Sequence, residues 1–208
     1  AMAKHIGKPM LLELFSERYA YFITKFEMNF IDAADKATGM STVQIDVENS
    51  ETFDLSYVDN EGKKQRFVIL HASIPGAVER VVLALLYRDG MTIRFKKTPM
   101  LPLWLSPMLV RIIPISDKLN KRCEEIVTSL AEEGFRVDFD DRGETLQKKI
   151  RQAEHEWVPF IAVIGEREAS EGNLSVRIRE TGKQETLTVN QLIEKLESGT
   201  IGKPKEKL

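Results

Sequence analysis

The stretch Leu109-Val110-Arg111-Ile112-Ile113-Pro114 decides the fold of the second half of this sequence, because it is an apolar run of buried-strand length. A helical pattern follows and ends at Gly134, a residue type that commonly terminates helices. Residues 135–139 then predict a strand, 146–157 a helix, and 158–164 a second, nearly continuous apolar strand. Strands that alternate with helices of this length predict a mostly parallel sheet covered by helices.

The C-terminal part adds a hairpin and a last helix. The hairpin turns at Thr181-Gly182. Thr188 is placed to cap the helix, with Gln191 three residues further on, the spacing of a capping box. The tail 199–208 is polar, and we expect it to be disordered.

The first half of the sequence follows a different pattern. Apolar residues recur at helical spacing over residues 10–24, and the period then changes to the alternation of half-buried strands. The strands are predicted at residues 25–32, 42–47, 53–58 and 66–70, with a helix at 76–87. Because a tight turn at residues 59–62 joins consecutive strands, we expect an antiparallel sheet.

A change in composition marks the boundary between the two halves. Residues 88–107 hold an Asp-Gly pair, a basic stretch and three prolines, which is typical of a linker. We therefore divide the chain into domains at 1–98 and 99–208.

Composition limits the classes of function. Of 208 residues, 42% are hydrophobic and the net charge is −2, so a core can form but any contact with nucleic acid must be a local patch. Cys123 is the single cysteine, so no disulfide forms within the chain, as in cytoplasmic proteins. No apolar run is long enough for a bilayer and no signal peptide is visible, so no membrane partner is expected.

Three histidines and one cysteine give no metal-ligand spacing, and no glycine-rich phosphate loop is present. The residues alone predict an antiparallel segment followed by an α/β domain, and they do not predict a function.

Three segments resemble a known family. The run from His71 to Arg80, HASIPGAVER, resembles motif 3 of class II aminoacyl-tRNA synthetases. Thr42-Val43-Gln44-Ile45-Asp46 looks like a strand of the threonyl enzyme, and residues 101–107 are similar to the entry of its anticodon-binding domain. The resemblance covers about residues 19–198. It implies the C-terminal half of an archaeal-type threonyl-tRNA synthetase: a mixed-sheet α/β anticodon-binding domain preceded by a truncated, antiparallel remnant of the class II catalytic domain.

The resemblance assigns catalytic roles in the remnant. Arg80 matches the motif 3 arginine that lies over ATP, and His71 matches one of three zinc ligands of the family. Gln44 and Lys25 match residues of the threonine pocket. The family's other zinc ligands and its motifs 1 and 2 would lie upstream of this chain. The family's Trp-Gln before the Thr-Val-Gln strand is replaced here by Thr38-Gly39. We therefore expect no bound ATP or zinc and no tRNA charging by this chain alone.

The anticodon half keeps more of the family's residues. Arg177 falls where the family uses an arginine on the central anticodon guanine, and Glu168 matches an acid that helps to hold the anticodon bases. The remaining residues predicted to contact tRNA are Arg142, Glu144, Lys149 and Arg151. The predicted helix 146–157 begins with a basic cluster of Lys148, Lys149 and Arg151. Without the resemblance, this cluster could be an ordinary solvent-exposed helix face.

Three functional hypotheses remain open. In the first, the chain anchors threonine tRNA, by its anticodon stem-loop, for proofreading by an editing domain upstream of it, and a separate synthetase charges the tRNA. In the second, it is the C-terminal fragment of a charging threonine–tRNA ligase. In the third, it is a synthetase-like adaptor whose anticodon fold docks another protein.

Overall fold

The computed structural model describes residues 2–204. The chain forms two compact units, and the division falls between Ala84 and Leu85, inside helix α3 (Val78–Met91). The domain limits predicted from the sequence, 1–98 and 99–208, stay a prediction. None of the described helices is both long and apolar enough to cross a membrane.

The first unit is built on a three-stranded antiparallel sheet in the order β1-β2-β5. Its strands are β1 (Phe22–Ile31), β2 (Ala37–Asp46) and β5 (Ile69–Ser73). The smaller elements are α1 (Met2–Ile6), α2 (Asn49–Thr52) and the two-stranded hairpin of β3 (Tyr57–Val58) and β4 (Lys64–Gln65). The antiparallel sheet and a turn at 59–62 are present as predicted, but that turn joins β3 and β4, which form a sheet of their own.

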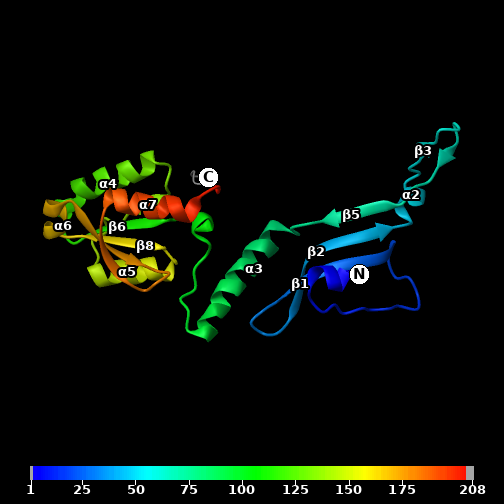
Figure 1. Cartoon of the computed structure of the whole chain (residues 1–208), viewed down its shortest axis with the longest axis horizontal. Coiled ribbons are helices and arrows are strands. Elements are labelled where there is room, and N and C mark those ends of the chain that lie inside the picture. The colour runs from blue at the N-terminus through cyan, green and yellow to red at the C-terminus, as the bar shows by residue number, and fades with distance from the viewer. Residues whose placement is uncertain (1, 205–208) are drawn as a thin grey trace. The chain divides into compact units, whose positions relative to one another are not determined.

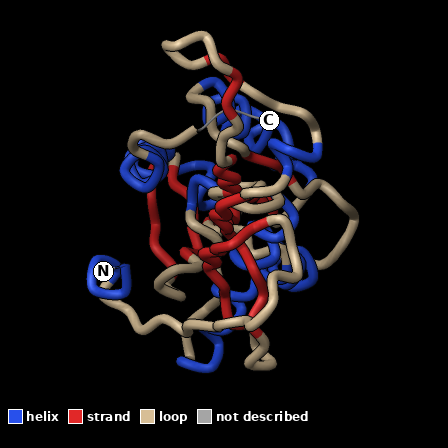
Figure 2. The backbone as a smooth tube through the Cα atoms, turned by 90° about the vertical axis from the view of Figure 1, so that its right-hand side faces the viewer, coloured by secondary structure: helices blue, strands red, loops and turns tan. Residues whose placement is uncertain are grey.

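The helix predicted at residues 10–24 is wrong. The chain between α1 and β1 runs as a loop (Figure 2), and residues 22–24 belong to β1. Leu11, Leu12 and Leu14 are 79–86% exposed, so the helical period has no core to face. Because an isolated helix of this length is marginal in water without packing, the pattern alone does not form one.

Two predicted strands of the first unit are also shorter or shifted. Only Tyr57–Val58 of the predicted strand 53–58 is extended and paired, because α2 and its exit occupy the residues before it. The strand predicted at 66–70 begins at Ile69 instead and continues to Ser73. Arg66 lies in the preceding loop, where its guanidinium donates to the carbonyls of Ser50 and Leu55.

The second unit contains a five-stranded mixed sheet in the order β10-β9-β8-β6-β7. The strands are β6 (Val110–Pro114), β7 (Val137–Phe139), β8 (Phe160–Ile164), β9 (Asn173–Ile178) and β10 (Gln184–Thr188). β6 is parallel to β7 and β8, whereas β9 and β10 join antiparallel. The mixed α/β fold expected from the family is therefore confirmed, and the mostly parallel sheet expected from the alternation of elements holds only for β6, β7 and β8.

Helices cover both faces of this sheet (Figure 1). The main core lies on the face of α4 (Asn120–Glu132) and α7 (Val189–Thr200), and it includes Ile112, Leu130, Val176 and Leu196. A smaller core lies under α5 (Leu146–His155), where Ile113, Ala153, Val158 and Ile161 meet. The remaining helices are α6 (Glu166–Glu171), η1 (Thr92–Phe95), η2 (Leu103–Leu105) and η3 (Asp117–Leu119).

The last helix begins at a capping box. The Thr188 hydroxyl accepts from the Gln191 backbone N–H at 3.2 Å, and the Gln191 side chain accepts from the Thr188 N–H at 2.9 Å, so the predicted capping box is present. α7 extends through Thr200, which is buried, whereas the sequence predicted disorder from residue 199. Residues 205–208 of that predicted tail lie outside the described residues.

Candidate nucleic-acid interface

One face of the β9–β10 hairpin is polar. Leu174, Val176 and Ile178 point into the main core, so the alternate residues of β9 point to the opposite side of the sheet. Directly paired residues share a face, and the register pairs Arg177 with Gln184 and Ser175 with Thr186. The side chains on this face therefore include Ser175, Arg177, Gln184 and Thr186.

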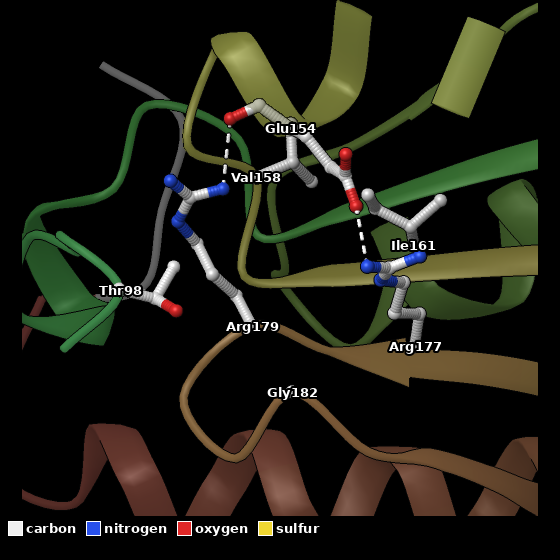
Figure 3. A pocket seen from close by; sticks show the side chains of 7 residues that line it. All are labelled: Thr98, Glu154, Val158, Ile161, Arg177, Arg179 and Gly182. Carbon is white, nitrogen blue, oxygen red and sulfur yellow. Dashed lines mark hydrogen bonds and ion pairs between the residues drawn. The ribbon is translucent and has the colours of Figure 1, made fainter. Parts of the chain in front are cut away.

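A cavity of about 270 Å³ opens beside this polar face (Figure 3). It lies where the end of α5, the start of β8, the end of β9 and the β9–β10 turn come together. Seven residues line it: Thr98, Glu154, Val158, Ile161, Arg177, Arg179 and Gly182. Its volume is just below the roughly 300–1,000 Å³ of sites for drug-sized ligands, so a group of the size of one nucleobase suits it.

Arg177 reaches this cavity from β9, opposite Ile161 of β8. Its Nη2 lies 2.9 Å from Oε1 of Glu154, and about half of the side chain is exposed. Ion pairs as exposed as this one contribute about 0–1 kcal/mol. The guanidinium can therefore exchange Glu154 for another acceptor at small cost.

Arg179, two residues on, is held differently. Its Nε donates to the Pro99 carbonyl at 2.7 Å and its Nη1 donates to the Glu154 carbonyl at 2.8 Å. The guanidinium also lies 5.9 Å from the centre of the Trp157 ring. Burial lowers the pKa of Arg179, which Glu154 partly offsets. Arg179 thus ties β9 to the linker and to the end of α5.

The cluster at the start of α5 is only partly available to a ligand. Arg142 donates from Nε and Nη2 to Asp140 at 2.8 and 2.7 Å, and this contact holds the pKa of Asp140 below its ordinary value. Glu144 accepts from Lys148 at 2.7 Å on the surface. Arg151 is exposed and faces solvent from the same helix.

Lys149 does not fit the predicted contact with tRNA. Only 4% of the residue is exposed, and its ammonium donates to the Asp140 carbonyl at 2.9 Å. Its position in the helix turns it inward with Ala153, one turn later, which belongs to the smaller core. The structure therefore gives Lys149 a structural role.

Glu168 caps its own helix. It lies in the first turn of α6, where its Oε2 accepts from the Gly165 N–H at 3.1 Å. α6 follows the end of β8, and the loop with Arg142 follows the end of β7, so both lie at the carboxyl edge of the parallel strands. Arg177 pairs with Ile161, near the start of β8, and is thus separated from Glu168 along the sheet.

The first unit brings three of the predicted residues into one row. Lys25 pairs with Gln44, and Gln44 with His71, across β1, β2 and β5. Each has a partner within the chain: Lys25 pairs with Glu27 at 2.5 Å, Gln44 accepts from the Tyr21 hydroxyl at 2.6 Å, and His71 Nε2 lies 2.7 Å from Oδ2 of Asp46. The fourth predicted residue, Arg80, donates to the Gly39 carbonyl at 3.0 Å.

Asp46 anchors this row. Burial alone would raise its pKa, but hydrogen bonds from the Asn49 N–H and from His71 outweigh burial and hold that pKa well below its usual range. Zinc does not fit the residues described here: within 2–204, no three His, Cys, Asp or Glu side chains gather as a metal site, and His71 is the single imidazole in the row. The Arg80 guanidinium could meet a phosphate of ATP, once released from Gly39.

Sequence reasoning missed Glu154, Arg179 and the polar face of the hairpin. The alternation of Leu174, Val176 and Ile178 with polar residues was the signal for that face. No local signal in the sequence links Glu154 to Arg177, because the two residues lie 23 positions apart on different elements.

The fold and this site define a class of protein. A mixed sheet with helices on both faces, and an arginine beside a cavity on a polar hairpin, make this unit an α/β domain with a candidate binding site. Residues 109–199 match the family described as the anticodon-binding domain, HGTP_anticodon.

Similarity to known proteins shows the family within this class. The chain is 49% identical over 206 residues to the threonine–tRNA ligase of Methanothrix thermoacetophila and 46% identical over 203 residues to that of Pyrococcus furiosus, covering 98% of the chain in each case. It covers 33% and 32% of those ligases. The RNA-binding domain of threonyl-tRNA synthetase from Cryptosporidium parvum Iowa II has a TM-score of 0.65 and 32% identity, over 86% of this chain and 44% of that one. The chain therefore belongs to the threonyl-tRNA synthetase family, and it spans about a third of the length of the curated relatives that it matches.

Proposed function

We propose that this chain binds threonine tRNA at its anticodon stem-loop and that Arg177 reads the central guanine. The observation that carries the proposal is the position of the Arg177 guanidinium, at a base-sized cavity and held by one exposed ion pair. The match of residues 109–199 to anticodon-binding domains supports it.

The hydrogen-bonding groups of arginine and guanine support a role for Arg177 in recognising the central base. The guanidinium is a planar fork of donors, and O6 and N7 of guanine are two acceptors at matching distance. Adenine has an amino group in place of O6, so one of the two bonds would be lost. Exposed cations such as Arg151 would meet the backbone phosphates, which add affinity but no base preference.

The test is titration of the chain with a threonine anticodon stem-loop and with one in which the central guanine is adenine, at two salt concentrations. We expect a preference for guanine over adenine of about 1–3 kcal/mol, which Arg177→Ala reduces. Overall affinity should fall as salt rises, because phosphate contacts release counterions. Arg122→Ala is the matched control, since Arg122 also forms a surface pair, with Glu125 on α4.

Two other results would count against the proposal. Base-blind binding by the unchanged chain would favour the adaptor hypothesis, in which the fold docks another protein. Equal loss with Arg122→Ala and Arg177→Ala would reduce Arg177 to a general surface charge.

We further propose that this part of the protein anchors tRNA for proofreading by an upstream domain. Support comes from the row of Lys25, Gln44 and His71, each of which has a partner within the chain. The alternative, tRNA charging with ATP and threonine, is supported by the names of the curated relatives.

A chimaera separates these two roles. The chain would replace the matching third of the P. furiosus ligase, and ATP–pyrophosphate exchange and stem-loop binding would both be measured. Retained tRNA binding without exchange is expected for a proofreading type. Exchange at a rate near that of the unmodified ligase would refute that role and favour charging.

A further inference from the structure

We infer that Glu154 is a second base-reading residue, whose carboxylate accepts hydrogen bonds from N1–H and N2–H₂ of the same guanine that Arg177 contacts. This inference rests on the proposed function, since it needs a guanine in the cavity. It assigns the specificity of the site to a pair of side chains of opposite charge.

The position of Glu154 is the first support. It lies in the last turn of α5, and its carboxylate reaches the cavity with Oε1 2.9 Å from Nη2 of Arg177 (Figure 3). About a third of the side chain is exposed. A ligand at the Arg177 guanidinium would therefore touch the Glu154 carboxylate as well.

Arg179 fixes this position. Its Nη1 donates to the backbone carbonyl of Glu154, and its Nε donates to that of Pro99. Glu154 is thus held at its backbone by one arginine and at its carboxylate by another (Figure 3). Because the backbone hold does not involve the carboxylate, a ligand can take the place of Arg177 without releasing the residue. Such pre-organisation is what base recognition requires.

The two charged groups complement guanine in particular. Arginine only donates, and an ionised carboxylate only accepts. Guanine offers acceptors at O6 and N7, beside donors at N1 and N2, and single-stranded RNA bases are commonly read on these edges. Adenine has an unprotonated N1 and no N2 amino group, so its edge would set a lone pair against the carboxylate. The pair therefore rejects adenine as well as attracting guanine.

The lining of the cavity strengthens these bonds. Val158 and Ile161 are both about 98% buried and line the cavity next to the two charges. An apolar wall excludes water from one side of the base, and hydrogen bonds to charged groups gain strength when water is excluded.

A simpler role for Glu154 predicts the opposite sign. If Glu154 only masks Arg177 in the free protein, its removal frees the guanidinium, and affinity for the guanine stem-loop rises. If Glu154 reads the base, its removal lowers that affinity and also lowers the preference for guanine.

The experiment uses stem-loops with guanine, inosine or 7-deazaguanine at the central position. Inosine lacks the N2 amino group, and 7-deazaguanine lacks N7. The unchanged chain should bind both analogues several-fold more weakly than guanine. Glu154→Ala should weaken guanine binding about tenfold and abolish the penalty for inosine, while the penalty for 7-deazaguanine remains. Arg177→Ala should abolish the penalty for 7-deazaguanine, while the penalty for inosine remains.

Controls keep the outcomes distinct. Glu154→Leu keeps the side chain large but removes both acceptor oxygens, and it should give the same pattern if Glu154→Ala fails to fold. Glu125→Gln, which removes a paired glutamate on α4, should change nothing. Unchanged or higher affinity in both Glu154 variants, with the inosine penalty intact, would overturn the inference. Lack of guanine preference in the unchanged chain would instead refute the proposed function itself.

Discussion

Replacement of Arg111 by methionine should destabilise the second unit by about 2 kcal/mol. Arg111 donates from Nε and Nη2 to Asp138, with a closest contact of 2.5 Å, and its Nη1 lies 2.7 Å from Glu156. Its side chain is 12% exposed, and those of Asp138 and Glu156 are 30% and 43% exposed. Breaking a fully buried pair costs about 3–5 kcal/mol, whereas exposed pairs contribute about 0–1 kcal/mol. Partial exposure of both carboxylates places Arg111→Met between these limits.

The assay is urea unfolding followed by tryptophan fluorescence. Both tryptophans of the chain, Trp104 and Trp157, lie in the second unit, so the signal reports that unit alone. Arg122→Met is the control and should change stability by less than about 0.5 kcal/mol. An effect of Arg111→Met within that same range would show that the contacts of Arg111 with Asp138 and Glu156 contribute no more than an exposed ion pair.

The destabilisation caused by Arg111→Met should depend on pH. Burial raises the pKa of Glu156, but hydrogen bonds from Gln152 and Arg111 outweigh burial and lower it. A carboxyl with a lowered folded pKa contributes stability that is present above its unfolded pKa and is lost as pH falls through the folded one. The destabilisation by Arg111→Met should therefore shrink as pH falls below about 4.3, the ordinary glutamate pKa.

Three further predictions concern residues outside the base-reading pair. Lys149→Ala should lower the free energy of unfolding by about 1–3 kcal/mol, because the Asp140 carbonyl loses its partner, and should leave the salt dependence of tRNA binding unchanged. Arg151→Ala should leave the free energy of unfolding unchanged and reduce the slope of the salt dependence by about one. Asp46→Asn should flatten the acid unfolding curve followed by circular dichroism, because the lowered pKa of Asp46 makes its contribution present above the unfolded pKa and lost as pH falls. Burial raises the pKa of Cys123 to about 11, so a thiol reagent at neutral pH should label the folded chain far more slowly than the unfolded one.

Local signals predicted much of the fold. The apolar runs at 109–114 and 158–164 became β6 and β8, because their length and composition suit strands buried on both faces. The capping box at Thr188 and Gln191 formed as predicted, since its bonds involve residues three positions apart.

Features that depend on distant partners were not predictable. Periodicity shows that an apolar stripe exists at residues 10–24 but not whether anything covers it, and residues 10–21 form a loop. Charge suggests a surface position for Lys149, whereas the helix turns it towards Asp140. The pairing of Glu154 with Arg177 depends on how α5 and β9 pack on one sheet, which no single segment encodes.

The most direct test of the account is the ratio of dissociation constants for adenine and guanine stem-loops, measured for the unchanged chain and for Arg177→Ala. We expect a ratio of about ten or more for the unchanged chain and a several-fold smaller ratio for the variant, in which Glu154 remains. A ratio near one for the unchanged chain, or one that Arg177→Ala leaves intact, would contradict the claim that Arg177 reads the anticodon.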